Sequence, residues 1–119
     1  MKKTLVLGAS LSTSRYSNLA IRRLKTCGSE VVAIGKVEGD IDGITIFTDK
    51  IPIENVHTVT IYLNPVNQAM YYDYILSIKP QRVIFNPGSE NLYFEELLKE
   101  STINFEHSCT LVLINMGLY

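Results

Sequence analysis

Short apolar runs of strand length alternate along the chain with longer stretches of helical spacing. The clearest runs are rich in β-branched residues and lie at residues 5–7, 31–34, 58–63 and 82–85. Near-continuous apolar runs are typical of strands that are covered on both faces of a sheet. Two weaker runs, at residues 45–47 and 104–106, are predicted as a short edge strand and a short last strand.

The stretches between the first runs carry helix cap signals. Residues 15–27 place apolar side chains on one stripe, and Gly28 follows in the position of a C-cap glycine. A second helix is predicted to begin at Asn64-Pro65, a capping residue followed by proline, and to end before Pro80 at about residue 79.

The remaining segments complete the pattern. A third helix is expected to begin near Ser89, and the apolar residues 109–119 are expected to form a short terminal helix on the sheet. Strand and helix in repeated alternation predict a Rossmann-like α/β domain of three layers. Its sheet should be mostly parallel and five- to six-stranded, with helices on both faces. The length of 119 residues fits one domain over residues 1–119.

Composition excludes several classes of protein. The formal net charge of −1 offers no global positive field for nucleic acid. The apolar runs are too short for a membrane span or a signal peptide. Two cysteines and two separated histidines suit neither a disulfide framework nor a zinc site, so no metal is expected. We expect a reduced, cytoplasmic protein.

Parallel sheets bind ligands beyond the carboxyl ends of their strands. In this chain those ends precede residues 8–17, 35–36, 63–65 and 86–91, and we expect the four loops to converge.

The first loop, residues 8–17, is suited to a phosphate. Gly8 ends the strand, and small residues follow up to a helix N-terminus, where backbone N–H groups can face an anion. Arg15 opposes the helix dipole at this end, and a bound anion would explain it. The alternative is a serine-rich cap with a solvated arginine.

No complete nucleotide motif is present. A GxGxxG fingerprint would need glycine where Ser10 and Thr13 stand, and there is no P-loop. Lys36 stands where NAD binders place a carboxylate, which favours a phosphorylated ribose, as in NADP or coenzyme A. An exposed loop lysine is the alternative.

The other two loops have simple structural alternatives. Asn64-Pro65 can be a helix cap and nothing more. Gly88 allows close backbone approach or a positive φ, and an ordinary strand-to-helix turn explains it equally.

Candidate catalytic residues are scarce. His57 precedes the fourth strand and should face away from the site. His107 and Cys109, two residues apart, suggest a nucleophile. The alternative is a small buried thiol beside a surface histidine. We predict no catalytic residue.

Several motifs together resemble the small stand-alone CoA-binding domain proteins of bacteria, which are similar to the CoA-binding domain of succinyl-CoA synthetase. The resemblance covers nearly the whole chain. It rests on Gly8-Ala9-Ser10, Arg15-Tyr16-Ser17, Ala20, Leu24, Gly28, Val31-Val32, Gly43, Ile51-Pro52, residues 60–65, the loop at residues 87–91 and His107-Ser108-Cys109. Gly35-Lys36-Val37 departs from the proline-containing turn that the family usually has there.

The resemblance implies a Rossmann-like fold that holds coenzyme A, or an acyl-CoA, across the strand ends. Residues matched to the pyrophosphate contacts are Gly8, Ala9, Ser10, Arg15 and Ser17. Lys36 would lie near the adenosine, and Asn64, Pro65 and Gly88 would line the cleft. The implied function is a non-catalytic binding or sensing module. A small NADP- or CoA-dependent enzyme, a reductase or an acyl or thiol transferase, is the alternative. A homodimer or an unidentified protein partner stays open.

Overall fold

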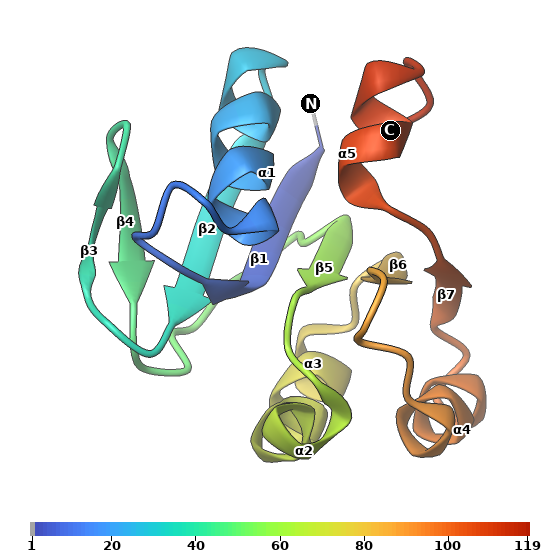
Figure 1. Cartoon of the computed structure of the whole chain (residues 1–119). Helices are drawn as coiled ribbons and strands as arrows, with labels where there is room; N and C mark the ends of the chain where they lie inside the picture. The colour runs from blue at the N-terminus through green and yellow to red at the C-terminus, as the bar shows by residue number, and fades with distance from the viewer. Residues whose placement is uncertain (1) are drawn as a thin grey trace.

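The strands form one seven-stranded sheet in the computed structural model, which describes residues 2–119. Its order is β3-β4-β2-β1-β5-β6-β7, and all neighbouring pairs are parallel except β3 and β4 (Figure 1). The strands are β1 Lys3–Ala9, β2 Glu30–Gly35, β3 Gly39–Ile41, β4 Ile44–Phe47, β5 Thr58–Ile61, β6 Arg82–Phe85 and β7 Asn104–His107.

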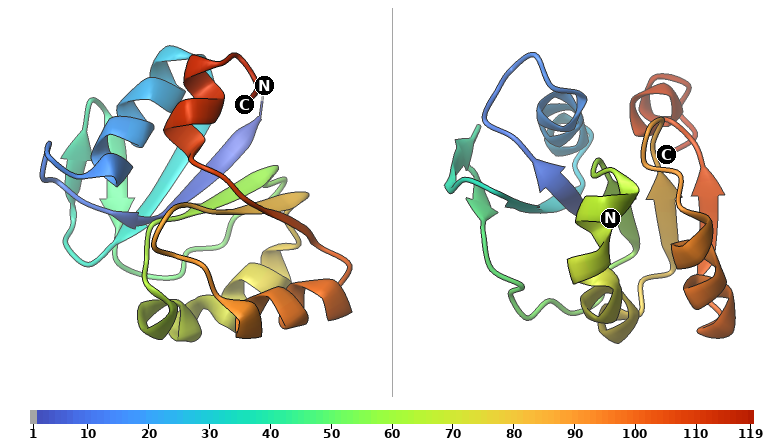
Figure 2. Two further views of the ribbon diagram at one scale, coloured as in Figure 1. Left: turned by 45° about the vertical axis from the view of Figure 1, so that its right-hand side comes forward. Right: turned by 60° about the horizontal axis from the view of Figure 1, so that its bottom comes forward.

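Helices cover both faces of the sheet. One face carries α1 (Tyr16–Thr26) and α5 (Thr110–Asn115), and the other carries the remaining helices (Figures 1 and 2). Those are α2 Pro65–Gln68, the 3₁₀ turn η1 Ala69–Tyr71, α3 Tyr72–Ile78 and α4 Leu92–Glu100. The predicted three-layer, Rossmann-like architecture is therefore confirmed. No helix among residues 2–119 is long and apolar enough to span a bilayer.

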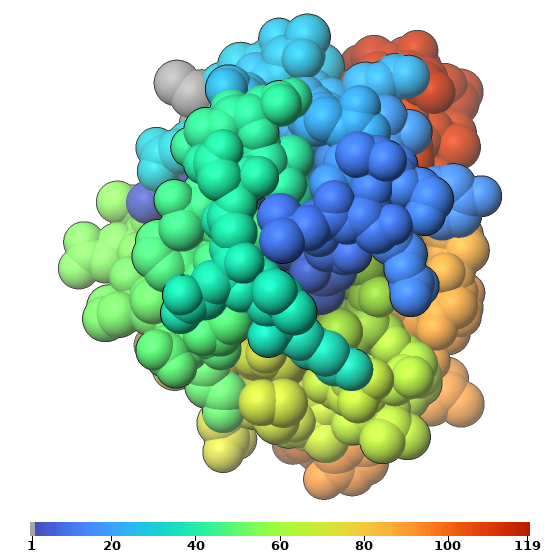
Figure 3. Space-filling model, turned by 60° about the vertical axis from the view of Figure 1, so that its left-hand side comes forward, coloured from blue at the N-terminus to red at the C-terminus, as the bar shows by residue number. Residues whose placement is uncertain are grey.

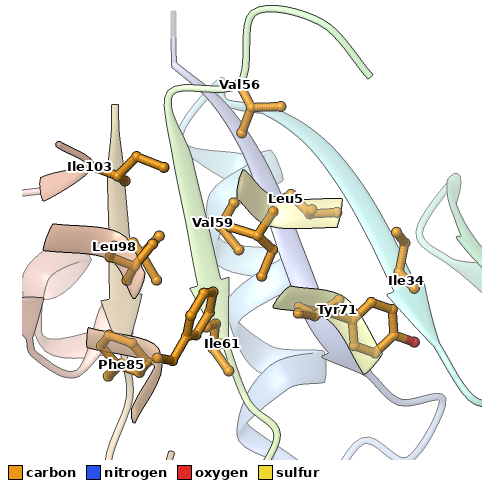
Figure 4. Packing of buried hydrophobic residues seen from close by; sticks show 13 residues of the cluster. Leu5, Ile34, Val56, Val59, Ile61, Tyr71, Phe85, Leu98 and Ile103 are labelled. Atoms are coloured by element: carbon orange, nitrogen blue, oxygen red, sulfur yellow. The ribbon is translucent and has the colours of Figure 1, made fainter. Parts of the chain in front are cut away.

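The core consists of two apolar layers, one on each face of the sheet. Leu5 and Leu7 of β1 pack in the layer under α3 and α4, together with Ile61 and Phe85 (Figure 4). Val6, between the two leucines in sequence, belongs to the layer under α1 and α5. Because alternate residues of β1 are buried on opposite faces, the strand has no polar side and its sequence shows a continuous apolar run.

The edge strand differs from the prediction. Residues 45–47, predicted to form an edge strand, belong to β4, which lies between β2 and β3. The edge strand is β3. A two-residue hairpin joins these strands, with φ of 49° at Asp42 and 89° at Gly43. The Asp40 carboxylate accepts from the Gly43 N–H at 2.9 Å. Asp-Gly between apolar residues is a strong local sign of such a hairpin, so this strand was predictable.

Two helix boundaries also differ from those predicted. The helix expected from residue 64 to 79 is divided into α2, η1 and α3. The helix expected near Ser89 begins at Leu92, because Asn91 caps it by accepting from the Phe94 N–H at 3.1 Å. The expected terminal helix is confirmed as α5.

Candidate functional site

The chain reverses its direction of winding between β1 and β5, which places the ends of these strands side by side. Gly8 stands at this point with φ of +97°, and a Cβ there would lie 3.1 Å from the Tyr62 carbonyl carbon and from the Leu63 side chain. Only a residue without a side chain allows the loop after β1 to pass so close to the end of β5.

The loop after β2 packs against the first loop. A Cβ on Gly35 would lie 2.2 Å from the carbonyl oxygen of Ala9, and one on Gly39 would meet the Leu11 side chain. Lys36 follows Gly35 directly, so the structure places this exposed lysine beside the residues that end β1.

A buried glutamine joins the other two loops. The Gln68 side-chain N–H₂ donates to the carbonyl of Leu63 at 2.8 Å and to that of Ser89 at 2.7 Å. Asn64 and Pro65 therefore lie next to the loop that contains Gly88. The four loop segments gather on one face of the molecule, around the recessed end of β1, as expected (Figure 3; blue, teal, lime and orange).

Local hydrogen bonds order the first loop. Ser12 N–H donates to Ser10 Oγ at 3.1 Å, and the Ser12 and Ser14 hydroxyls are bonded at 2.9 Å. The Asn18 amide donates to the Ser10 carbonyl at 2.9 Å, which ties the loop to α1. The loop is thus shaped by its own polar groups.

Arg15 is the cation of this loop. It is the N-cap residue of α1, with φ −84° and ψ 141°, and its side chain makes no capping bond. It is exposed, and its guanidinium forms no hydrogen bond or ion pair with any of residues 2–119. The first turn of α1 contains no acidic residue. A cation at the positive end of a helix, without a partner, is placed to meet an anion.

Other predicted contacts are less available to a ligand. Ala9 and Ser17 are buried, so a ligand can reach the loop surface but not these side chains. The Gly88 N–H already donates to the Glu90 carboxylate, at 3.0 and 3.2 Å. Asn64 Oδ1 caps α2 by accepting from the Asn67 N–H at 2.9 Å.

Nearly the whole chain matches a known protein family. A family model described as CoA binding domain matches residues 2–115. The chain belongs to this family of CoA-binding domains. No curated protein matches the chain by sequence.

Solved structures support the assignment of the fold. One described only as an uncharacterized protein is 50% identical, with 100% of this chain and 98% of that chain covered and a TM-score of 0.96. A Thermus thermophilus protein is 21% identical, with coverage of 99% and 90% and a TM-score of 0.87. A conserved hypothetical protein from Pyrococcus furiosus is 18% identical, with coverage of 94% and 98% and a TM-score of 0.83. The last two show the fold alone.

This CoA-binding domain also uses a buried amide that the sequence analysis missed. The Asn86 N–H₂ donates to Thr60 Oγ1 at 2.7 Å and to the Ile61 carbonyl at 2.9 Å. Its Oδ1 accepts from the Thr110 N–H at 2.9 Å, which ties β5, β6 and α5 together. A polar residue directly after an apolar strand was the available signal.

Tyr62 directly follows β5, and its phenol hydroxyl lies inside the fold. The hydroxyl is buried without a hydrogen-bond partner, and the neighbouring Thr60 and Thr110 hydroxyls are bonded to each other at 2.7 Å. Burial raises the pKa of Tyr62 to about 12, so the phenol stays protonated.

Cys109, the candidate nucleophile, and His107 have different surroundings. Cys109 is half-buried at the N-cap of α5. His107 Nε2 is held at 3.0 Å by the buried carboxylate of Glu95 on α4, and its ring packs near Phe85. A buried carboxylate needs such a partner, which gives His107 a structural reason to be there.

The opposite edge of the sheet carries His57, as predicted. Two open hollows of about 340 and 300 Å³ share His57 and Gln81 there, at the amino ends of the strands. Among residues 2–119, no cluster of His, Cys, Asp or Glu could hold a metal ion.

Proposed function

We propose that this domain binds coenzyme A or an acyl-CoA along the carboxyl edge of its sheet, as a module for binding or sensing. In this proposal the pyrophosphate lies on the loop of residues 8–14 against Arg15. The phosphorylated adenosine lies beside Lys36, and the pantetheine arm continues past Asn64 toward the Gly88 loop.

The observation that carries the proposal is the unpartnered Arg15 at the N-cap of α1, next to the ends of β1 and β5. The chain also belongs to the CoA-binding family. Gly8 and Gly35 let the first loop pack against the ends of β5 and β2, which brings the proposed pyrophosphate and adenosine contacts together.

Arg15→Ala tests the proposal directly. We expect calorimetric titration to show CoA binding weakened by about 1–3 kcal/mol, because a charge-assisted hydrogen bond is lost. The apo protein should be no less stable, since a cation leaves the positive end of α1.

Arg23→Ala is the matched control. It removes an exposed arginine from the last turn of the same helix, where cations suit the dipole. CoA affinity should be unchanged in this variant. If Arg15→Ala binds CoA as tightly as the native protein does, the assigned pyrophosphate position is wrong.

A further inference from the structure

The candidate site changes character along the edge of the sheet. Its exposed cations, Arg15 and Lys36, belong to the loops after β1 and β2. The loop and helix after β5 have none, and residues 55–72 contain no Asp, Glu, Lys or Arg. The half of the edge after β1 and β2 therefore suits an anion. The loops after β5 and β6 contain no cation and one exposed carboxylate, that of Glu90.

The half after β5 and β6 exposes two large apolar side chains. Val66 in the first turn of α2 is 84% exposed, and Leu92 at the start of α4 is 81% exposed. No other large hydrophobic side chain in residues 2–119 is so exposed. Surface helices ordinarily present polar side chains to water, so an apolar side chain exposed beside a binding site is available to an apolar part of the ligand.

These two positions are held by a buried network. Gln68 bonds the carbonyls of Leu63 and Ser89, and the Asn91 N–H₂ donates to Gln68 Oε1 at 2.9 Å. Gln68 and Asn91 are buried, at 0% and 6% exposure, so the starts of α2 and α4 are fixed to each other. Val66 lies two residues before Gln68, and Leu92 directly follows Asn91, so both belong to the helix starts that this network joins.

The order of the strands sets the direction of a bound ligand. The carboxyl edge runs β2-β1-β5-β6. A CoA molecule with its adenosine phosphate at Lys36 and its pyrophosphate at Arg15 extends from β2 across β1. Its pantetheine arm then crosses β5 and β6, and the thiol ends near the exposed starts of α2 and α4.

We infer that this site takes acyl-CoA with an uncharged, apolar acyl chain, and that Val66 and Leu92 contact that chain. The inference rests on the proposed function and adds the class of acyl group. The exposed Glu90 carboxylate, two residues before Leu92 and bonded to the Gly88 N–H, opposes a second carboxylate on the acyl group.

Titration of CoA, hexanoyl-CoA and succinyl-CoA into the native protein at one ionic strength tests the inference. Hexanoyl-CoA should bind about tenfold more tightly than CoA, as expected when roughly two methylene groups leave water. Succinyl-CoA should bind no more tightly than CoA, because its terminal carboxylate faces Glu90.

Two variants locate the contact. Val66→Ser and Leu92→Ser should each reduce the gain for hexanoyl-CoA, and the double variant should abolish it, while CoA affinity stays unchanged. Both side chains are exposed, so the fold should tolerate the changes. Met116→Ser, at an exposed apolar position on the C-cap of α5, is the control and should keep the full gain.

The outcomes separate the two proposals. Binding of none of the three ligands overturns both the proposed function and the inference. Equal affinity for CoA and hexanoyl-CoA in the native protein overturns the inference and leaves the proposed function standing. A gain that survives in the double variant also overturns it, because the acyl chain then lies elsewhere.

Discussion

Lys36 is the residue that we propose to set the nucleotide preference of the site. It follows the last residue of β2, is exposed, and stands beside the first loop through the contact of Gly35 with Ala9. A carboxylate in this position would accept from ribose hydroxyls, whereas an ammonium attracts a ribose phosphate. On the proposed function, the charge of this one residue should favour coenzyme A over its dephosphorylated form.

We predict that CoA binds about two- to fivefold more tightly than dephospho-CoA, the range for an exposed ion pair. Added salt should narrow the gap, because exposed charges are screened. Lys36→Ala should lose the discrimination and keep most of the affinity. Calorimetric titrations of both ligands at low and high salt measure these effects.

Lys99→Ala is the control for Lys36→Ala, because Lys99 is an exposed lysine in the last turn of α4. It should leave the preference for CoA unchanged. Equal affinities of the native protein for the two ligands would contradict the role of Lys36.

Asn86 connects elements that the sequence separates. It follows β6, and its side-chain amide bonds the Thr60 hydroxyl and Ile61 carbonyl of β5 and the Thr110 N–H of α5. The side chain is buried, so water cannot replace these partners if it is removed. The docking of α5 at the carboxyl edge therefore depends on one residue.

We predict that Asn86→Ala lowers the free energy of unfolding by about 2–4 kcal/mol, because buried donors and acceptors lose their partners. Urea denaturation followed by circular dichroism measures the change. Asn104→Ala, an exposed asparagine on β7, should change stability by no more than about 0.5 kcal/mol. A similarly small effect for Asn86→Ala would mean that the network does not stabilise the fold.

The two edges of the molecule have different chemistry. The carboxyl edge carries the candidate site, and the amino edge carries His57 near the cations Lys2 and Arg82. Burial lowers the pKa of His57, and these two cations lower it further. His57 Nδ1 lies 2.7 Å from the Thr58 hydroxyl, a bond that the neutral ring can accept.

The lowered pKa of His57 predicts that the free energy of unfolding depends on pH. Unfolded His57 binds a proton near its ordinary pKa of 6.5, whereas the folded side chain binds it only at lower pH. Below pH 6.5 the unfolded state therefore holds more protons, and the free energy of unfolding falls as pH decreases toward the folded pKa.

His57→Gln should reduce this loss, which urea denaturation of both proteins between pH 7 and pH 5 will measure. CoA affinity at pH 7 should be the same in both, because His57 lies at the opposite edge from the candidate site. An identical decline in stability with pH in the two proteins would contradict the assignment to His57.

The fold class and most of the helices and strands could be predicted from the sequence alone, because the relevant interactions are local. Apolar runs mark strands buried on both faces, and Asn64-Pro65 and Gly28 mark helix ends. The sequence also identified Arg15 as a cation at the wrong end of a helix. Even the missed strand β3 had a local sign in Asp42-Gly43.

The polar groups that are free for a ligand could be identified only from the tertiary structure. Gln68 and Asn86 bond to partners 21 to 26 residues away in sequence. Ser17 is buried, although it belongs to the same motif as the exposed Arg15. Hydrogen bonds and burial of this kind depend on which strands become neighbours, and local sequence patterns do not contain that information.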